Sequence, residues 1–513
     1  MTNDRSTRPS RTASKVPGGA DGCLGSIVNF TRPPVAFSTS FAHTCSTLAV
    51  RWCCGETHED IVRIVCAGAG RAAATRPRSR LVTTRLFMCD MLSSGSGDGY
   101  QLTRGSVAAF KRVLDSAAEK RNPLGTRQGI GRSFRTEGRP TMARTYDVID
   151  ADGHILEPID IWDKYIDPAY RDRAPKMIID TDGKERLLVE GKVLGSPKGM
   201  GAIGGIGARD GKINEATMRY VEGRPGGFDP HARIPDMDLD GIDAAFLYPS
   251  IGLFSGAVQD PGLAAAMCRA YNRWLADYCK PYPDRLFGVA MLPMQSIPAA
   301  IEEMRFARKE LGMRGGFLRP NPYNGRMLHH PDYAPFWNEV EELDFAIGLH
   351  EGASGGMPQV GVDRFKNRGA RHIISHTMEM MLAAMSVIWE GVCDRYPKVR
   401  IGFMESGGGW IAPWLDRMDR HFDDQGFNDS GLTMRPSELF QRNCWISFEP
   451  VEGSLSVLAD YIGPHKILWA TDYPHPDGFF PGAPKLIADR QELSAETKRQ
   501  ILAGGAKGFY GLK

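Results

Sequence analysis

From Tyr146 onward, short runs of apolar and β-branched residues alternate with stretches in which apolar residues recur at positions i, i+3 and i+4. The short runs are typical of buried strands and the longer stretches of amphipathic helices, so the pattern predicts repeated βα units. Helices are expected at 263–278 and 297–311, where Pro or Gly stands near the ends. The eight predicted strands are 146–151, 244–248, 286–292, 315–319, 345–350, 399–405, 444–448 and 467–472.

Eight such units between residues 144 and 513 predict an α/β fold of the (β/α)8 class, a TIM barrel. An insertion is expected after the first strand. The segment KMIIDTDGKERLLVEGKVLG predicts a β-hairpin that turns at Asp182 and Gly183, and GMGAIGGIGARDG predicts a mobile glycine-rich loop. These glycines do not follow a buried strand of a βαβ unit, so they do not form a nucleotide-binding fingerprint.

The first 143 residues differ from the rest in charge and pattern. They hold 18 Arg and 3 Lys against 10 acidic residues, a net charge of +11, whereas residues 144–513 carry −9. Apart from an apolar patch at 61–66 and a helix near 107–118, no apolar period is sustained, so we expect a mostly disordered extension rich in Arg, Ser and Gly. Met142 opens the segment MARTYDVIDADGH directly before the first strand, which favours a mis-assigned start over a transit peptide.

Composition excludes several classes of function. The sequence contains no run of 18 apolar residues, so it predicts no membrane span. Its net charge of +2 and the lack of a nucleic-acid-binding motif do not indicate binding to DNA or RNA. Six of the ten cysteines lie in the extension, at spacings that match no CxxC-type zinc site. The four in the barrel are scattered and suit the reducing cytoplasm, where we expect the protein to act: Cys268, Cys279, Cys393 and Cys444.

Candidate chemistry gathers where predicted strands end, which is where TIM barrels place catalytic groups. Asp152 and His154 follow strand one and share a face, because alternate residues of an extended segment point the same way. Strand five leads into His350, strand six into Glu405 and strand eight into Asp472. Each residue alone is explained more simply by capping or hydrogen bonding. Together, two imidazoles and two carboxylates predict a divalent metal held by Asp152, His154, His350 and Asp472, with Glu405 nearby.

Four motifs, VIDADGHILEP, AIGLHEG, GVCDRYPKVRIGFMESGGGW and ILWATDYPHPD, also resemble a known family. Residues 146–512 are similar to the amidohydrolase-related proteins of the aminocarboxymuconate-semialdehyde decarboxylase type. The resemblance implies a metal-dependent (β/α)8 enzyme with the same four ligands and a homodimeric assembly. One departure is Asp152 in place of a histidine, which makes the site richer in oxygen, so manganese or magnesium competes with zinc, the preferred ion. The other is Glu405, followed by Ser-Gly-Gly-Gly, where the family has an acid–base histidine.

Some group must still transfer protons. Glu405 ends a strand beside the predicted metal, where burial raises and a cation lowers the pKa of a carboxyl group, so acid and base roles are both open. His376 and His475 are the other catalytic candidates, and a structural role explains either of them about equally well.

Substrate contacts are predicted around the same centre. Arg319, at the end of strand four, can clamp a substrate carboxylate with its guanidinium group, although a bracing role fits as well. Trp410 and Tyr473 lie near strand ends and are expected to line an apolar substrate pocket, with simple packing as the alternative. Glu157 is expected to orient His154 through a hydrogen bond.

A divalent ion polarises a substrate carboxylate or carbonyl and acidifies water, so the ligands alone fit both decarboxylation and hydrolysis. With the family resemblance, we expect a carboxy-lyase acting on a small, anionic, ring-derived carboxylic acid. The alternative is a metal-dependent hydrolase of a lactone, an amide or a C–C bond. A third hypothesis, a barrel that binds a ligand without turnover, is favoured only by the missing histidine after strand six.

Overall fold

The computed structural model describes residues 63–64, 100–101 and 145–513, except 196–197, 209–210, 212–213, 215–216 and 353–355. The chain divides into two units, residues 1–137 and 138–513. In the first unit, strands β1 (Arg63–Ile64) and β2 (Tyr100–Gln101) pair antiparallel, and β1 falls in the predicted apolar patch. The helix expected near 107–118 lies outside the described residues.

The second unit contains the predicted barrel. Its strands form a parallel ladder β3-β7-β8 and a parallel ladder β9-β10-β11-β12-β13-β14. Only Val289 separates β8 from β9, so these two short strands together form one strand of the barrel. Because β14 lies beside β3, the two ladders close into one eight-stranded barrel. The strands are β3 (Ile149–His154), β7 (Ala244–Tyr248), β8 (Leu286–Gly288), β9 (Ala290–Met291), β10 (Gly315–Leu318), β11 (Ala346–Leu349), β12 (Arg400–Phe403), β13 (Cys444–Phe448) and β14 (Ile467–Trp469).

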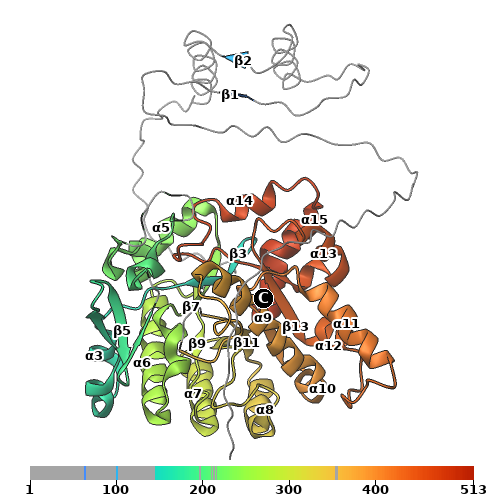
Figure 1. The fold of residues 1–513 in the computed structure, drawn as a ribbon, viewed down its shortest axis with the longest axis horizontal. Helices are drawn as coiled ribbons and strands as arrows, with labels where there is room; N and C mark the ends of the chain where they lie inside the picture. The colour runs from blue at the N-terminus through green and yellow to red at the C-terminus, as the bar shows by residue number, and fades with distance from the viewer. Residues whose placement is uncertain are drawn as a thin grey trace, which may run out of the picture. The chain divides into compact units, whose positions relative to one another are not determined.

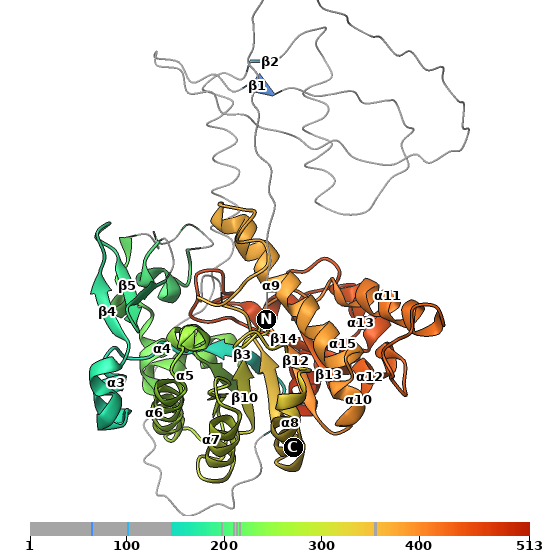
Figure 2. The ribbon, with the colours of Figure 1, turned by 60° about the horizontal axis from the view of Figure 1, so that its bottom comes forward.

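Helices cover the outside of the barrel, so the strands are buried on both faces and read as continuous apolar runs. Figures 1 and 2 show α6 (Pro261–Cys279), α7 (Ile297–Lys309) and α8 (Ala334–Glu342) side by side along this outer surface. Proline at the first helical turn and a capping side chain start α6 and α7, where Asp260 accepts hydrogen bonds from two backbone N–H groups and Ser296 from one.

The insertion after β3 contains the predicted hairpin, formed by β4 (Lys176–Ile179) and β5 (Glu185–Val189). Gly183 turns the chain with a φ of 77°, a value that glycine adopts without steric cost. A third strand, β6 (Lys192–Leu194), pairs with β5 and was not predicted, because the run is short and only Leu194 is buried. The glycine-rich segment includes a short 3-10 helix at Met200–Gly204.

Several strand ends differ from the prediction, and two of these differences position the site. Strand β3 runs to His154, three residues further than expected, because Asp150, Asp152 and His154 are buried within the strand despite their polarity. Strand β14 ends at Trp469, and the chain then turns through Asp472 with a φ of 53°. Between β11 and helix α9 (Arg368–Ala384) a long connection crosses the same end of the barrel.

None of the helices in the described part of the chain has the length and apolar character needed to cross a membrane.

We propose that the part of the chain from Met142 is sufficient for folding and metal binding. The hydrophobic core of the described residues begins at Tyr146, and the composition of the extension offers little apolar surface to offset its chain entropy. A protein starting at Met142 is therefore expected to melt cooperatively within a few degrees of the full chain and to bind the same amount of divalent metal. Calorimetry and metal analysis of both proteins check this. Loss of the cooperative transition or of the metal would contradict it.

Candidate metal centre

The structure brings the four predicted ligand side chains together at the C-terminal mouth of the barrel. Nε2 of His154 lies 3.1 Å from Nε2 of His350 and 3.4 Å from Oδ1 of Asp472. Nε2 of His350 lies 3.6 Å from Oδ2 of Asp152. All four residues are buried. Side chains separated by up to 320 positions in the chain, from Asp152 to Asp472, thus meet around one point.

The hydrogen bonds of the two imidazole rings decide where their lone pairs point. Nδ1 of His154 lies 2.9 Å from the carbonyl oxygen of Pro249, and Nδ1 of His350 lies 2.6 Å from that of Glu351. A carbonyl oxygen only accepts, so each Nδ1 carries a proton and each neutral ring has its lone pair on Nε2. Two Nε2 lone pairs that face each other are stable only with a proton or a cation between them.

The carboxylates also leave ligand atoms without partners. Oδ1 of Asp152 and Oδ1 of Asp472 are buried and make no hydrogen bond within the described residues, although Oδ1 of Asp472 lies 2.9 Å from Nδ1 of His475. Buried polar atoms of this kind require an explanation. Asp152, His154 and His350 form one group of side chains that could hold a metal ion, and His154, Asp472, Glu405 and His475 form another. Two imidazoles and two carboxylates fit a divalent ion.

Buried side chains behind the ligands tie β3 to the segment after β14. The carboxylate of Asp150 accepts hydrogen bonds from the backbone N–H of Thr471 at 3.0 Å and from its hydroxyl at 2.5 Å. Arg233, also buried, donates to the carbonyl oxygen of His154 at 2.7 Å. These contacts hold Asp472 in its positive-φ conformation, a strained backbone state that occurs preferentially at functional sites.

Glu405 lies between a predicted ligand and a predicted catalytic histidine. Its Oε2 is 2.9 Å from Nε2 of His350, and its Oε1 is 3.7 Å from Nε2 of His376. Burial alone would raise the pKa of Glu405, but His350, followed by His376, lowers it to about 2. In return, burial alone would lower the pKa of His350, but the carboxylates of Asp152 and Glu405 raise it to about 9. Glu405 is therefore ionised at neutral pH.

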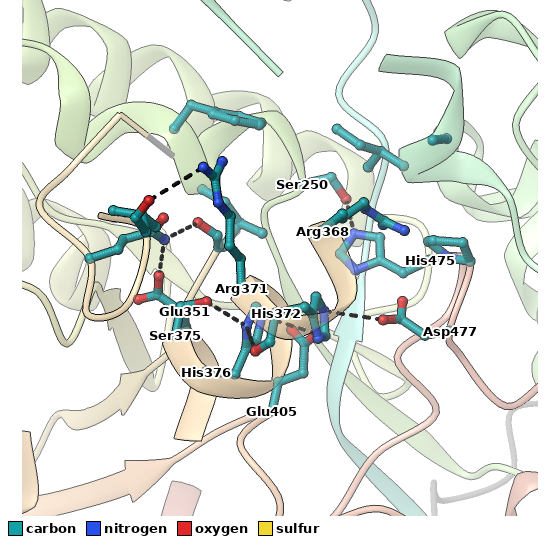
Figure 3. Close-up of a pocket in the computed structure, with 18 of the residues that line it drawn as sticks. Ser250, Glu351, Arg368, Arg371, His372, Ser375, His376, Glu405, His475 and Asp477 are labelled. Atoms are coloured by element: carbon teal, nitrogen blue, oxygen red, sulfur yellow. Dashed lines mark hydrogen bonds and ion pairs between the residues drawn. The ribbon is translucent and has the colours of Figure 1, made fainter. Parts of the chain in front are cut away.

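The two predicted catalytic histidines face the same centre. Burial lowers the pKa of His376 to about 3 and that of His475 to about 4, so both rings are neutral at pH 7. Figure 3 shows His475 hydrogen-bonded to Ser250, with 2.8 Å between Nε2 and Oγ. It also shows the ion pair between His372 and Asp477, where Nε2 and Oδ2 are 3.4 Å apart.

Two cavities adjoin this centre. The first has a volume of about 390 Å³, and Ser250, Glu351 and His475 line part of it. The second, of about 310 Å³, is lined by Asp152 and Asp472. Residues that line both cavities are His372, His376, Glu405 and Asp477. Two of the three proton-transfer candidates, Glu405 and His376, therefore line both cavities, and the third, His475, lines only the first.

Three cationic side chains, Lys366, Arg368 and Arg371, also line the first cavity. They belong to the start of α9 and the residues before it, which the sequence-based prediction did not include. The spacing of His372 and His376 on one helical face, one turn beyond Arg368, was the available signal. Glu351, Glu405 and Asp477 line the same cavity, so side chains of both signs face it, and the three cations offer partners for the carboxylate of a ligand.

Arg319 is placed differently from the predicted clamp. Its side chain is fully buried, and its guanidinium group donates to Oε1 of Glu351 at 2.8 Å and to the carbonyl oxygens of Leu253 and Gly352 at 2.7 and 2.9 Å. It is not among the residues that line the two cavities. The geometry thus favours the bracing alternative for Arg319.

The structure does not bring the two predicted aromatic residues to these cavities. The hydroxyl of Tyr473 donates to Asp236 at 2.6 Å, and the indole N–H of Trp410 lies 3.4 Å from the hydroxyl of Ser406. Their predicted contact with substrate remains a prediction that this geometry does not favour. Glu157 does not bond to His154. Its carboxylate instead accepts hydrogen bonds from the backbone N–H groups of residues 250–252, and these bonds hold the loop after β7 in place.

The chain is similar to known proteins in sequence. The family model described as amidohydrolase matches residues 149–512. The chain is 29% identical over 287 residues to 2-amino-3-carboxymuconate-6-semialdehyde decarboxylase of Dictyostelium discoideum, covering 56% of this chain and 77% of that protein. It is 25% identical over 307 residues to gamma-resorcylate decarboxylase of Rhizobium sp. (strain MTP-10005), covering 52% and 85%.

Among solved structures, an amidohydrolase from Mycobacterium avium subsp. paratuberculosis K-10 superposes with a TM-score of 0.61 at 22% identity, over 72% of this chain and all of that one. At this level of identity the likeness concerns the fold, and it confirms the predicted barrel.

Proposed function

The chain belongs to the amidohydrolase-related family, of the aminocarboxymuconate-semialdehyde decarboxylase type, and we propose that it is a metal-dependent carboxy-lyase acting on a small ring-derived carboxylic acid. One observation carries the proposal. Two imidazole Nε2 atoms and two carboxylate oxygens that accept no hydrogen bond among the described residues converge at the barrel mouth, beside a cavity that three cationic side chains help to line. The relatives from Dictyostelium and Rhizobium, both decarboxylases of small carboxylic acids by name, support the reaction class.

Asp152, His154, His350 and Asp472 would hold the ion. Zinc is the preferred metal, and the two carboxylates make manganese or magnesium a competitor, because oxygen ligands suit these harder ions. When bound, the ion supplies a positive charge that polarises a substrate carboxylate or carbonyl. Lys366, Arg368 and Arg371 would attract an anionic substrate into the larger cavity.

Loss of carbon dioxide from a ring carboxylate leaves an electron pair on the ring carbon, which must receive one proton. At neutral pH Glu405 is ionised and His376 and His475 are neutral, so none of the three holds a spare proton in the free protein. We propose that Glu405 passes one proton from solvent water to the ring carbon as the bond to the carboxylate breaks, so that the ring carboxylate and one proton become the protonated ring and carbon dioxide. His376, 3.7 Å away, would orient the carboxylate.

The same set of bases favours hydrolysis as a second candidate. A neutral His475 and an ionised Glu405 are both suited to taking a proton from water, as hydrolysis of a lactone, an amide or a C–C bond requires.

We further propose a homodimer, from the family resemblance. A cytoplasmic location is proposed because the four cysteines of the described barrel are free and buried.

Isotopes separate the two reactions. A decarboxylase reacting in deuterium oxide is expected to release carbon dioxide and to place one deuterium at the carbon that carried the carboxylate. A hydrolase would instead place oxygen from labelled water in its product. The metal-loaded protein would be screened against hydroxybenzoates, muconate semialdehydes, lactones and small amides by mass spectrometry. Oxygen incorporation without carbon dioxide release would overturn the proposed reaction.

A further inference from the structure

Two histidines of α9, His372 and His376, lie one helical turn apart, and each faces a carboxylate. Their rings stack with 4.0 Å between the centroids. Nε2 of His376 lies 3.7 Å from Oε1 of Glu405, and Nε2 of His372 lies 3.4 Å from Oδ2 of Asp477. Figure 3 shows these four side chains close together, with both histidines on the same helix. Two histidines at positions i and i+4 of a helix are a known pair of zinc ligands.

The contacts of His376 decide where its lone pair points. Its Nδ1 lies 3.2 Å from the carbonyl oxygen of His372, which only accepts, so Nδ1 carries the proton and Nε2 the lone pair. The hydroxyl of Ser375, 3.3 Å from the same Nδ1, can accept as well. The lone pair on Nε2 therefore faces the carboxylate of Glu405 without a proton between them.

The spacing of these atoms fits ligands of a common ion. A tetrahedral zinc ion with bonds of about 2.1 Å places its ligand atoms about 3.4 Å apart. The distances of 3.7 Å from His376 to Glu405 and 3.4 Å from His372 to Asp477 are close to this value. Both distances exceed the length of an ordinary N–H···O hydrogen bond, which is about 2.9 Å. His372, His376 and Glu405 also offer three ligand atoms within 4.8 Å of one another.

The second cavity has the charge expected around a cation. Six carboxylates line it, and neither Lys nor Arg is among the described residues of its lining. The six residues are Asp152, Glu405, Glu449, Glu452, Asp472 and Asp477. Charges of one sign in a cleft create a potential that raises the local concentration of the opposite ion. A cation in this cavity is within reach of both histidines of α9, because they line it too.

We propose that His372, His376, Glu405 and Asp477 bind a second divalent cation, separate from the ion at the barrel mouth. We call these four residues the α9 site. Zinc is the preferred ion, because imidazole and carboxylate groups are among its usual ligands. The two ions would share Glu405, whose Oε2 lies 2.9 Å from Nε2 of His350 while its Oε1 faces His376.

The α9 site is expected to be the weaker of the two. The side chain of His372 is 33% exposed, whereas those of His154 and His350 are fully buried, and two cations on one carboxylate repel each other. An ion at the α9 site should therefore be lost on gel filtration, which the ion at the barrel mouth survives.

Equilibrium dialysis of the full chain against increasing zinc, with bound zinc measured by mass spectrometry, tests the α9 site. His372→Ala and Asp477→Asn should each weaken the binding of the weaker ion by about tenfold or more and leave the tighter ion unchanged. His350→Ala should weaken the tighter ion, which separates the two sites. Zinc bound elsewhere is common to all the proteins and drops out of the comparison.

The matched control is His330→Ala. Nδ1 of His330 lies 3.6 Å from Oδ2 of Asp332, a histidine–carboxylate pair of similar spacing, and neither residue lines the two cavities. This variant should bind zinc as the unsubstituted protein does. Melting temperatures verify that each variant is folded.

A consequence for turnover rests on the proposed function, whereas the α9 site itself does not. An ion held by Oε1 of Glu405 would stop this carboxylate from passing a proton. With a substrate found in the isotope screen, zinc beyond the amount that fills the tighter site should inhibit, and His372→Ala should need about tenfold or more zinc for the same inhibition.

Identical zinc binding in the unsubstituted protein and in folded His372→Ala and Asp477→Asn would overturn the α9 site. Loss of the tighter ion in these two variants would also overturn it, because the four residues would then belong to a single centre. A weaker ion that depends on His372 and Asp477 but does not inhibit would contradict the proton-transfer role of Glu405 and leave the α9 site supported.

Discussion

Replacing His350 by alanine or Asp472 by asparagine is expected to weaken the binding of divalent metal on the order of a hundredfold or more. This exceeds the effect of replacing residues that only hydrogen-bond to a metal ligand, which is about tenfold to a hundredfold. Both substitutions remove one of the four predicted ligands, whose side chains are linked by distances of 3.1 Å from His154 to His350, 3.4 Å from His154 to Asp472 and 3.6 Å from His350 to Asp152. Metal content after gel filtration, measured by mass spectrometry, should fall from about one ion per chain to a small fraction.

Matched controls lie in the same part of the sequence but away from the centre. His465→Ala changes a histidine just before the start of β14, and Asp460→Asn changes an exposed carboxylate on helix α13 (Leu455–Ile462). Both control proteins should keep full occupancy. Full occupancy in His350→Ala and Asp472→Asn as well would refute the ligand assignment.

Metal affinity should also fall as the pH decreases. In the metal-free protein the neighbouring carboxylates raise the pKa of His350 to about 9, and burial raises that of Asp152 to about 8. Below these values each group holds a proton that the ion must displace, so protons compete with the metal. We expect the apparent affinity to drop about tenfold or more from pH 8 to pH 7, as competition titration with a chelating dye would measure. A constant affinity over this range would contradict the predicted ligands.

The barrel could be predicted from the sequence because most of its strands are short, continuous runs of apolar or small residues. Two strands, β7 and β13, have the predicted bounds, and both are buried along their whole length. The pattern was least informative where polar residues enter a strand, as at Asp150 to His154 in β3. These residues are buried because they bind one another and the chain after β14, and such long-range partners leave no periodic signal.

The same distinction applies to the site. The ligand residues were predictable because the ends of parallel strands meet at one face of the barrel, so a local position implied a spatial one. The role of Arg319 was not predictable, because its partner Glu351 lies 32 residues away and follows a different strand. Equally, only the folded chain shows that α9 brings Arg368 and Arg371 to the cavity.

The second large effect is expected for Glu405→Gln, which should keep the metal and lower turnover by about a hundredfold or more, the range for loss of a general acid or base. Glutamine preserves the size of the side chain but cannot take up a proton from solvent and pass it to the ring carbon. Glu405, two residues after the end of β12, also adopts a φ of 41°, a strained backbone conformation that helps to place its carboxylate between His350 and His376.

Steady-state rates with a substrate found in the isotope screen would measure the effect, with metal content determined on the same samples. The matched control is Glu379→Gln, because it changes another buried glutamate, which lines neither of the two cavities. If Glu405→Gln loses the metal, Glu405 acts as a ligand, as its grouping with His154, Asp472 and His475 would allow. If the variant keeps both metal and full activity, proton transfer belongs to His376 or His475, the two neutral imidazoles that face the same centre.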